Sequence, residues 1–148
     1  MKQNGSVIIP TMRYKDALKA IEWLCKAFGF EKHLVVPGEN GTIVHAQLSF
    51  GNAMIMLGSE NDNEYGKLLR TPKDLNGFNT QTPYIVVEEI DEHYRGAIAA
   101  EAEIVLDIKD EEYGGRGYGC KDPEGYIWYF GSYNPWSNEK EKPTHNKK

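Results

Sequence analysis

The stretch GYGCKDPEGYIWYFGSYNPW, residues 117–136, carries the strongest structural signal in the sequence. At its centre is DPEG, residues 122–125, whose proline at the second position and glycine at the fourth are typical of a type I turn. We interpret its two carboxylates as turn-forming rather than catalytic. Side chains alternate along the strand that follows, so Trp128 and Phe130 share one face, whereas Ile127 and Tyr129 share the other. This pattern predicts a hairpin with a final aromatic strand, in which Trp128 and Phe130 pack under a helix.

The two halves of the chain predict the same order of elements, β-α-β-β-β. The first half predicts a strand over 6–12, a helix over 13–30, and strands over 32–36, 42–50 and 53–58. The second half predicts a strand over 83–89, a helix over 90–102, and strands over 103–109, 115–121 and 125–133. Between them lies a polar segment with Gly, Pro and Asn breakers, a kind of long loop that is often functional. We expect one α+β domain over 1–148, with tandem βαβββ modules over about 6–58 and 82–134, a linker over about 59–81, and a flexible tail over about 137–148.

The first predicted helix has an apolar stripe with helical spacing. Asp16 lies near its start, and Gly29 can end it. The stripe consists of Ala17, Ala20, Ile21, Leu24 and Phe28. One face of each strand must pack under such a helix, so the opposite face either meets solvent or lines a cleft.

Composition and charge exclude several classes of function. The chain has 148 residues and a net charge of −5, which argues against nucleic acid because phosphate binding needs a basic patch. No apolar run is long enough for a membrane helix, and the N-terminus lacks the apolar core of a signal peptide. Two cysteines, Cys25 and Cys120, form neither a metal motif nor a disulfide framework, so we expect a reduced, cytoplasmic setting.

The dipeptide Gly51-Asn52 predicts a two-residue hairpin turn. This turn would pair Gln47 with Met56, and paired residues share a face of the sheet. One face would then contain His45, Gln47, Ser49, Met54 and Met56. The other face, which we expect to meet the helix, would contain Val44, Ala46, Leu48 and Phe50.

Three stretches resemble the glyoxalase/bleomycin-resistance/dioxygenase superfamily, also called the vicinal oxygen chelate superfamily. MRYKDALKAIEWLCKAFGFE (12–31) is similar to the family's first helix, and VHAQLSFGNAMIML (44–57) to its strand-turn-strand. YGGRGYGCKDPEGYIWYFGSYNPW (113–136) is similar to its C-terminal signature. The resemblance covers about residues 6–136, and its HAQL run and aromatic final strand look closest to the PhnB-like branch.

This resemblance implies paired βαβββ modules that form a curved mixed sheet around a cavity, and a homodimer. In metal-dependent members, the first and last strands of each module supply ligands, usually His, Gln or Glu. By motif, these positions fall on Ile9, Thr82, Met56 and Tyr129. Because a catalytic divalent ion normally needs about three good ligands, mostly His or carboxylate, the resemblance implies neither a metal nor a cofactor here.

Aromatic walls with a few polar groups suit a ligand pocket. The favoured hypothesis is a metal-free protein that binds a small planar or cationic molecule by stacking and cation–π contacts. The candidate ligand-binding residues are His45, Gln47, Met56, Thr82, Tyr84, Tyr129, Ile9, Thr11 and Arg116. The alternative is an enzyme, either a metal-dependent lyase, isomerase or dioxygenase of the same superfamily, or a cofactor-free catalyst using His45 and Tyr129. A dimerisation scaffold without a ligand is the third hypothesis.

Three further features have predicted positions or roles. His33 and His93 are predicted to lie on the surface of a strand and a helix. Tyr118 is grouped with Tyr84 and Tyr129 as a stacking residue. The acidic run at residues 110–112 is predicted to be a solvated loop that could rim a pocket for a cationic ligand.

Overall fold

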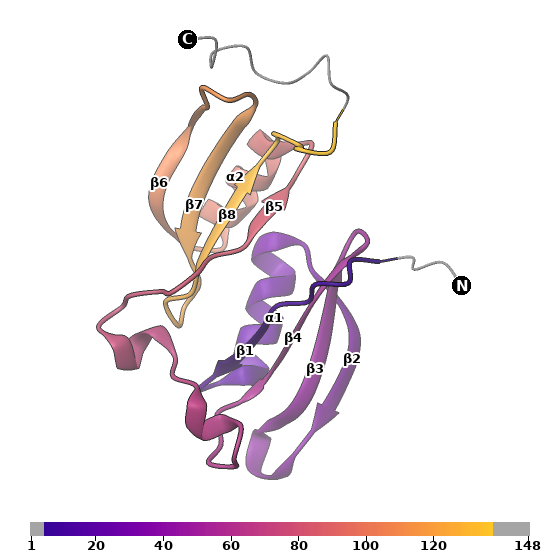
Figure 1. Ribbon diagram of the computed structural model, residues 1–148, viewed down its shortest axis with the longest axis vertical. Coiled ribbons are helices and arrows are strands. Elements are labelled where there is room, and N and C mark those ends of the chain that lie inside the picture. Colours follow the sequence, from indigo (N-terminus) through magenta and orange to yellow (C-terminus); the bar gives the residue numbers. More distant parts are fainter. Residues whose placement is uncertain (1–4, 138–148) are drawn as a thin grey trace.

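The computed structural model describes residues 5–137, which form two βαβββ modules joined by a linker (Figure 1). The first module comprises β1 (Thr11–Tyr14), α1 (Ala17–Phe28), β2 (Glu31–Pro37), β3 (Ile43–Phe50) and β4 (Ala53–Ser59). The second comprises β5 (Tyr84–Val86), α2 (Ile90–Ala99), β6 (Glu103–Asp110), β7 (Arg116–Lys121) and β8 (Ile127–Gly131). Short 3-10 helices occur at Glu39–Gly41 and, in the linker, at Gly66–Leu68 and Pro72–Leu75. No helix within residues 5–137 is long and apolar enough to cross a membrane.

Each module forms one four-stranded mixed sheet, and the two sheets have the same topology. The strand order is β1-β4-β3-β2 in the first sheet and β5-β8-β7-β6 in the second. The edge strands β1 and β5 run parallel to β4 and β8, and the other neighbours are antiparallel. The α+β fold of tandem βαβββ modules is therefore confirmed, built as two separate sheets.

The two modules form an internal repeat: several residues that shape the backbone of the first module recur in the second at one constant interval along the sequence. In the first module, Met56 N–H donates to the carbonyl of Pro10, and in the second, Tyr129 N–H donates to the carbonyl of Pro83. Each module's last strand also ends in a Gly-Ser pair whose serine hydroxyl accepts a backbone N–H from the neighbouring strand. These bonds join Ser59 Oγ to Ile43 N and Ser132 Oγ to Arg116 N, both at 2.9 Å.

The first strand begins later than predicted. The sequence indicated a strand over 6–12, whereas β1 covers Thr11–Tyr14 and pairs with Met56–Ser59. The physical reason is that Pro10 has no N–H to donate, so only its carbonyl joins the ladder. Arg13 consequently belongs to a strand, although the sequence pattern placed it at the start of the helix.

The helix α1 forms as predicted, and its apolar stripe packs on the first sheet. The Asp16 side chain caps it by accepting from Lys19 N–H, and Gly29 ends it with a left-handed φ of 89°. On β3, Ala46 and Leu48 are buried against the helix. Val44 is 63% exposed, and Ile43 is buried instead. The prediction for Val44 was wrong because the β2–β3 register shifts beside it, between Val36 and Pro37.

The two modules pack together through their helices and the sheet faces beneath them. The Phe28 ring at the end of α1 lies 5.6 Å from Trp128 and 4.6 Å from Phe130, between ring centroids. The indole N–H of Trp23 donates to the carbonyl of Ala100 at 2.9 Å. Trp128 and Phe130 are fully buried, which confirms the face assigned to them. We call the opposite faces of the two sheets the open faces.

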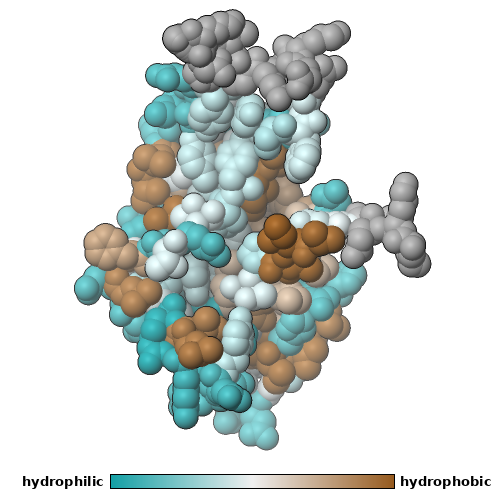
Figure 2. All heavy atoms as spheres, viewed as in Figure 1, coloured by the Kyte–Doolittle hydropathy of each residue, from teal (hydrophilic) through white to brown (hydrophobic). Residues whose placement is uncertain are grey.

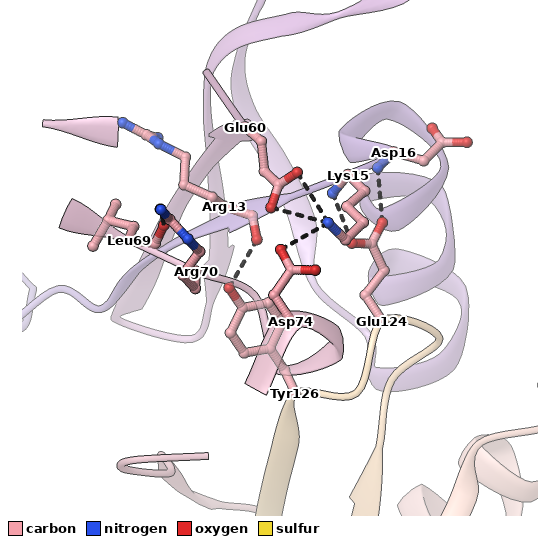
Figure 3. A network of polar contacts seen from close by, with 9 residues as sticks. All are labelled: Arg13, Lys15, Asp16, Glu60, Leu69, Arg70, Asp74, Glu124 and Tyr126. Carbon is pink, nitrogen blue, oxygen red and sulfur yellow. Dashed lines mark hydrogen bonds and ion pairs between the residues drawn. The ribbon is translucent and has the colours of Figure 1, made fainter. Parts of the chain in front are cut away.

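The DPEG turn joins the modules as well as reversing the chain. Asp122 accepts hydrogen bonds from Tyr14 Oη at 2.7 Å and from Trp128 Nε1 at 3.1 Å, and it also shapes the turn. Glu124 reaches the other module, where its carboxylate accepts the N–H groups of Lys15 and Asp16 at 2.7 and 2.8 Å (Figure 3). Both carboxylates therefore have structural roles, and that of Glu124 extends to the N-cap of α1.

His93 lies in the module interface and not on the surface as predicted. Its Nε2 atom is 2.8 Å from the Phe28 carbonyl, which can only accept, so Nε2 carries the proton and Nδ1 accepts from Tyr118 Oη at 2.7 Å. Burial lowers the pKa of His93, and the bond to Phe28 opposes this shift. Tyr118 is fully buried beside it, on the face opposite to Tyr129. His33 is exposed, as predicted.

Candidate functional site

The open face of the first sheet brings together most of the residues predicted for the first module. The ladder pairs Gln47 with Met56 and Ser49 with Met54, as the Gly51-Asn52 turn predicted. Thr11 lies beside Met56 on the other side, across the parallel pair of β1 and β4. The Nε2 atoms of His45 and Gln47 are 3.1 Å apart, so these two polar side chains of the face are hydrogen-bonded to each other.

The open face of the second sheet is aromatic. Tyr84 and Tyr129 lie beside each other in the parallel pair of β5 and β8, with ring centroids 5.8 Å apart. The rings lean over glycines: a Cβ atom at Gly131 would lie 2.5 Å from Tyr84 Oη, and one at Gly117 would lie 2.8 Å from Tyr129 Cε1. Because glycine leaves this space free, the rings can rest on the sheet with part of their surface outward. Tyr84 remains 39% exposed.

A carboxylate and two more tyrosines surround this aromatic pair, and the sequence did not single out the tyrosines. Tyr129 Oη donates to Glu111 Oε2, and Tyr84 Oη donates to the Tyr133 carbonyl at 2.7 Å. The rings of Tyr113 and Tyr133 pack edge to face at 5.1 Å. The acidic run that was expected to rim a pocket thus contributes Glu111 to the site.

The electrostatics of the tyrosines make them donors and not bases. Burial raises the pKa of Tyr84 to about 12, so its phenol is neutral at physiological pH. Burial, followed by the hydrogen bond to Glu111, also raises the pKa of Tyr129. The cluster can therefore offer ring faces and one carboxylate, but no phenolate nucleophile.

The remaining predicted site residues lie apart from these two groups. Ile9 and Thr82 precede the strands, so the ladder positions beside Met56 and Tyr129 are occupied by Thr11 and Tyr84. Arg116 lies on the helix side of the second sheet, where it pairs with Asp91 of α2 at 3.2 Å and with Asp110 at 2.9 Å. A cavity of about 180 Å³ between the modules is lined by Met54 and Tyr84, among others.

These donors do not fit a catalytic divalent ion. The ladder positions offer a hydroxyl, a thioether and two neutral phenols, and the two strong donors near them, the His45 imidazole and the Glu111 carboxylate, belong to different modules. Within residues 5–137, no three His, Cys, Asp or Glu side chains gather into a group that could hold a metal ion. Such a site normally needs about three ligands, mostly imidazole or carboxylate.

The sequence reasoning missed a pair of arginines. Arg13 lies on the open face of the first sheet, in register with Gly58, and its guanidinium carbon is 5.3 Å from the centroid of the Tyr65 ring. Arg70 of the linker lines the same two cavities as Arg13. No local motif marks either residue, because the linker must fold back on β1 to bring them together.

Comparisons with known proteins agree with this architecture. The model of the Glyoxalase/Bleomycin resistance protein/Dioxygenase superfamily matches residues 8–130. An uncharacterized protein of Mycobacterium tuberculosis strain H37Rv is 30% identical over 122 residues, which cover 82% of this chain and 71% of that protein.

Two solved structures extend the comparison. TioX from Micromonospora sp. ML1 is 30% identical, with a TM-score of 0.70, over 88% of this chain and 100% of TioX. TnmS3, an antibiotic binding protein from Streptomyces sp. CB03234, shares the fold at 13% identity and a TM-score of 0.62, over 88% of this chain and 98% of that one. Taken with the match over residues 8–130, these likenesses show that the chain belongs to the glyoxalase/bleomycin resistance/dioxygenase superfamily.

Proposed function

We propose that this protein binds a small planar, cationic organic molecule on the open face of the second sheet, without using a metal. The observation that carries the proposal is the tyrosine pair Tyr84 and Tyr129, which lean over glycines beside the carboxylate of Glu111. Ring faces attract cations by about 0.5–2 kcal/mol each, and a nearby carboxylate adds a favourable charge. A planar cation can contact the ring faces and the carboxylate at the same time.

The family context supports a binding role. TnmS3, which has this fold, is an antibiotic binding protein. Such a role needs contact area and charge, which the tyrosine cluster offers. It does not need a cluster of three metal ligands, and the described residues of the open faces form none. Metal analysis of the purified protein tests the second point: we expect substoichiometric Ni, Zn, Mn and Fe, and a stoichiometric, tightly held ion would refute the metal-free reading.

Binding is tested with a matched pair of probes, the planar cation N-methylacridinium and its neutral analogue acridine at alkaline pH. We expect the cation to bind more tightly, and Tyr129→Leu to weaken it by about tenfold, the equivalent of one lost contact of about 1.4 kcal/mol. Glu111→Gln should weaken the cation but not acridine. Tyr65→Leu, which removes an exposed tyrosine beside the first sheet, is the control and should change neither. Equal binding of both probes, or equal effects of Tyr129→Leu and Tyr65→Leu, would refute the proposal.

We further propose that a second copy of the chain covers the open faces, forming a homodimer. In the single chain, the first sheet's open face presents Leu34 and Val36, and the second presents Leu106, each between 38% and 52% exposed. Brown atoms mark further apolar surface on the face seen in Figure 2. Val7 and Ile8, which precede β1, are over 70% exposed. Apolar surface rimmed by polar residues often marks a protein–protein interface.

The oligomeric state is measured by size-exclusion chromatography with light scattering. We expect the mass of a dimer for the wild-type chain and of a monomer for Leu34→Glu, whose charge would be buried in the interface. A monomeric wild-type protein would refute this part of the proposal and leave the tyrosine site to be judged by the probe titrations.

A further inference from the structure

We propose a second ligand site, separate from the tyrosine cluster, in which Arg13 and Arg70 bind a small organic anion. The site is the cavity between β1 and the linker, of about 240 Å³. It would accept a carboxylate attached to an apolar body.

Among the residues that the structure describes, Arg13 has no acidic partner, and its surroundings hold it in place. Its side chain crosses β4 at Gly58, where a Cβ atom would lie 3.1 Å from Nη1, so glycine makes its path possible. The Tyr65 ring covers one side of the guanidinium, and Tyr65 Oη lies 3.4 Å from Thr11 Oγ1. The Nε–H group is buried, with no hydrogen-bond partner among the described residues. A buried, unpaired donor costs free energy, so an acceptor from outside the chain would stabilise this arrangement.

Arg70 also lacks an acidic partner among residues 5–137. Its Nη1 atom donates to the carbonyls of Leu69 at 2.7 Å and of Lys67 at 3.3 Å, which leaves the other guanidinium nitrogens for a ligand. These bonds to the linker backbone fix the side chain beside that of Arg13 without neutralising its charge.

Two of the nearby acids are engaged elsewhere. Glu60 and Asp74 both pair with Lys15, at 3.3 and 3.0 Å, and Figure 3 shows the two arginine head groups on the side of this network away from Lys15. A neighbouring cavity of about 320 Å³, which also touches both arginines, is lined by these two acids, Asp62 and Lys67. Its mixed charges make it a poorer site for an anion.

The 240 Å³ cavity has a one-sided charge. Arg13 and Arg70 are the charged residues that line it. Its apolar wall is made by Pro10, Met12, Leu69, Pro72, Leu75 and Phe78. A cavity of about 150 Å³ can hold benzene, so this volume suits an aromatic ring with one carboxylate. Guanidinium groups match the planar geometry of a carboxylate, and two of them can hold both of its oxygens.

Isothermal titration calorimetry with benzoate and its neutral analogue benzamide tests the site. We expect benzoate to bind and benzamide to bind at least tenfold more weakly. Arg70→Gln and Arg13→Gln should each weaken benzoate by about tenfold or more, as expected for a charge-assisted hydrogen bond. Arg95→Gln removes the same charge from an exposed position on α2 and should have no effect. Tyr129→Leu should also leave benzoate binding unchanged, so this proposal and the tyrosine site can fail separately.

Several results would overturn the inference. These are no binding of benzoate, equal binding of benzamide, unchanged affinity in Arg70→Gln, or an equal loss in Arg95→Gln, which would indicate a general charge effect. Arg13 is half-buried, so if Arg13→Gln does not fold, Arg70→Gln decides the question, because Arg70 is bonded to the linker backbone alone.

Discussion

The contact between Glu124 and the start of α1 predicts that Glu124→Gln weakens the whole fold. Glu124 is 7% exposed, and its carboxylate accepts two backbone N–H groups, those of Lys15 and Asp16. Glutamine has the same shape but offers one acceptor oxygen and turns an NH2 group toward the second N–H. One charge-assisted hydrogen bond is lost, and a buried donor loses its acceptor.

The magnitude follows from these two changes. A hydrogen bond to a charged group contributes about 1.5–3 kcal/mol, and the interaction of an anion with a helix N-terminus about 0.3–1 kcal/mol. The remaining oxygen retains part of this, so we expect a loss of about 2 kcal/mol in the free energy of unfolding. For a chain of 148 residues, this corresponds to a fall in Tm of about 6 °C.

Urea denaturation followed by tryptophan fluorescence measures the effect, because Trp128 is fully buried next to the turn. Glu64→Gln, which removes the same charge from an exposed position in the linker, is the matched control and should shift the midpoint little. Because Glu124 joins the modules, the slope of the transition should also fall if they begin to unfold separately. The reasoning fails if the two variants lose equal stability.

Two further predictions follow from the module interface and the aromatic face. Burial lowers the folded-state pKa of His93 below its unfolded value of about 6.5, so protonation favours the unfolded chain. The free energy of unfolding should therefore be full above pH 6.5 and fall below it. His93→Gln should flatten this pH profile in thermal melts, and an unchanged profile would contradict the burial argument. Gly131→Ala should displace the Tyr84 ring and weaken N-methylacridinium binding, while Gly96→Ala, whose Cβ would lie 3.9 Å from the Ala27 carbonyl oxygen and whose φ is likewise not positive, is the control. Equal binding by the two variants would show that the ring position does not matter.

Local sequence patterns were enough to predict much of the fold. The Gly51-Asn52 turn fixes the register of β3 and β4, because a two-residue loop leaves one pairing, and it correctly placed Gln47 opposite Met56. The alternation in the last strand correctly separated Trp128 from Tyr129. In both cases the information lies within a few residues of the element that it specifies.

The features that the sequence did not reveal depend on distant contacts. Glu124 caps a helix more than a hundred residues earlier in the chain, and His93 receives its partners from α1 and β7. Arg13 was assigned to the helix because nothing local separates it from the Asp16 cap. Its role becomes visible when the linker brings Tyr65 and Arg70 over β1.

The repeat explains why the two open faces can have different chemistry on one scaffold. The prolines, glycines and serines that recur at a constant interval fix the backbone of both modules. At the matching ladder position, Gln47 faces Met56 in the first sheet, whereas Gly119 faces Tyr129 in the second. A bulky ring needs a small residue beside it, so the tyrosine face requires its glycines as a set. The first face carries side chains of medium size, with Arg13 on its edge strand. We therefore propose a cation on one face and an anion at the edge of the other, although the strands beneath them have the same order and direction.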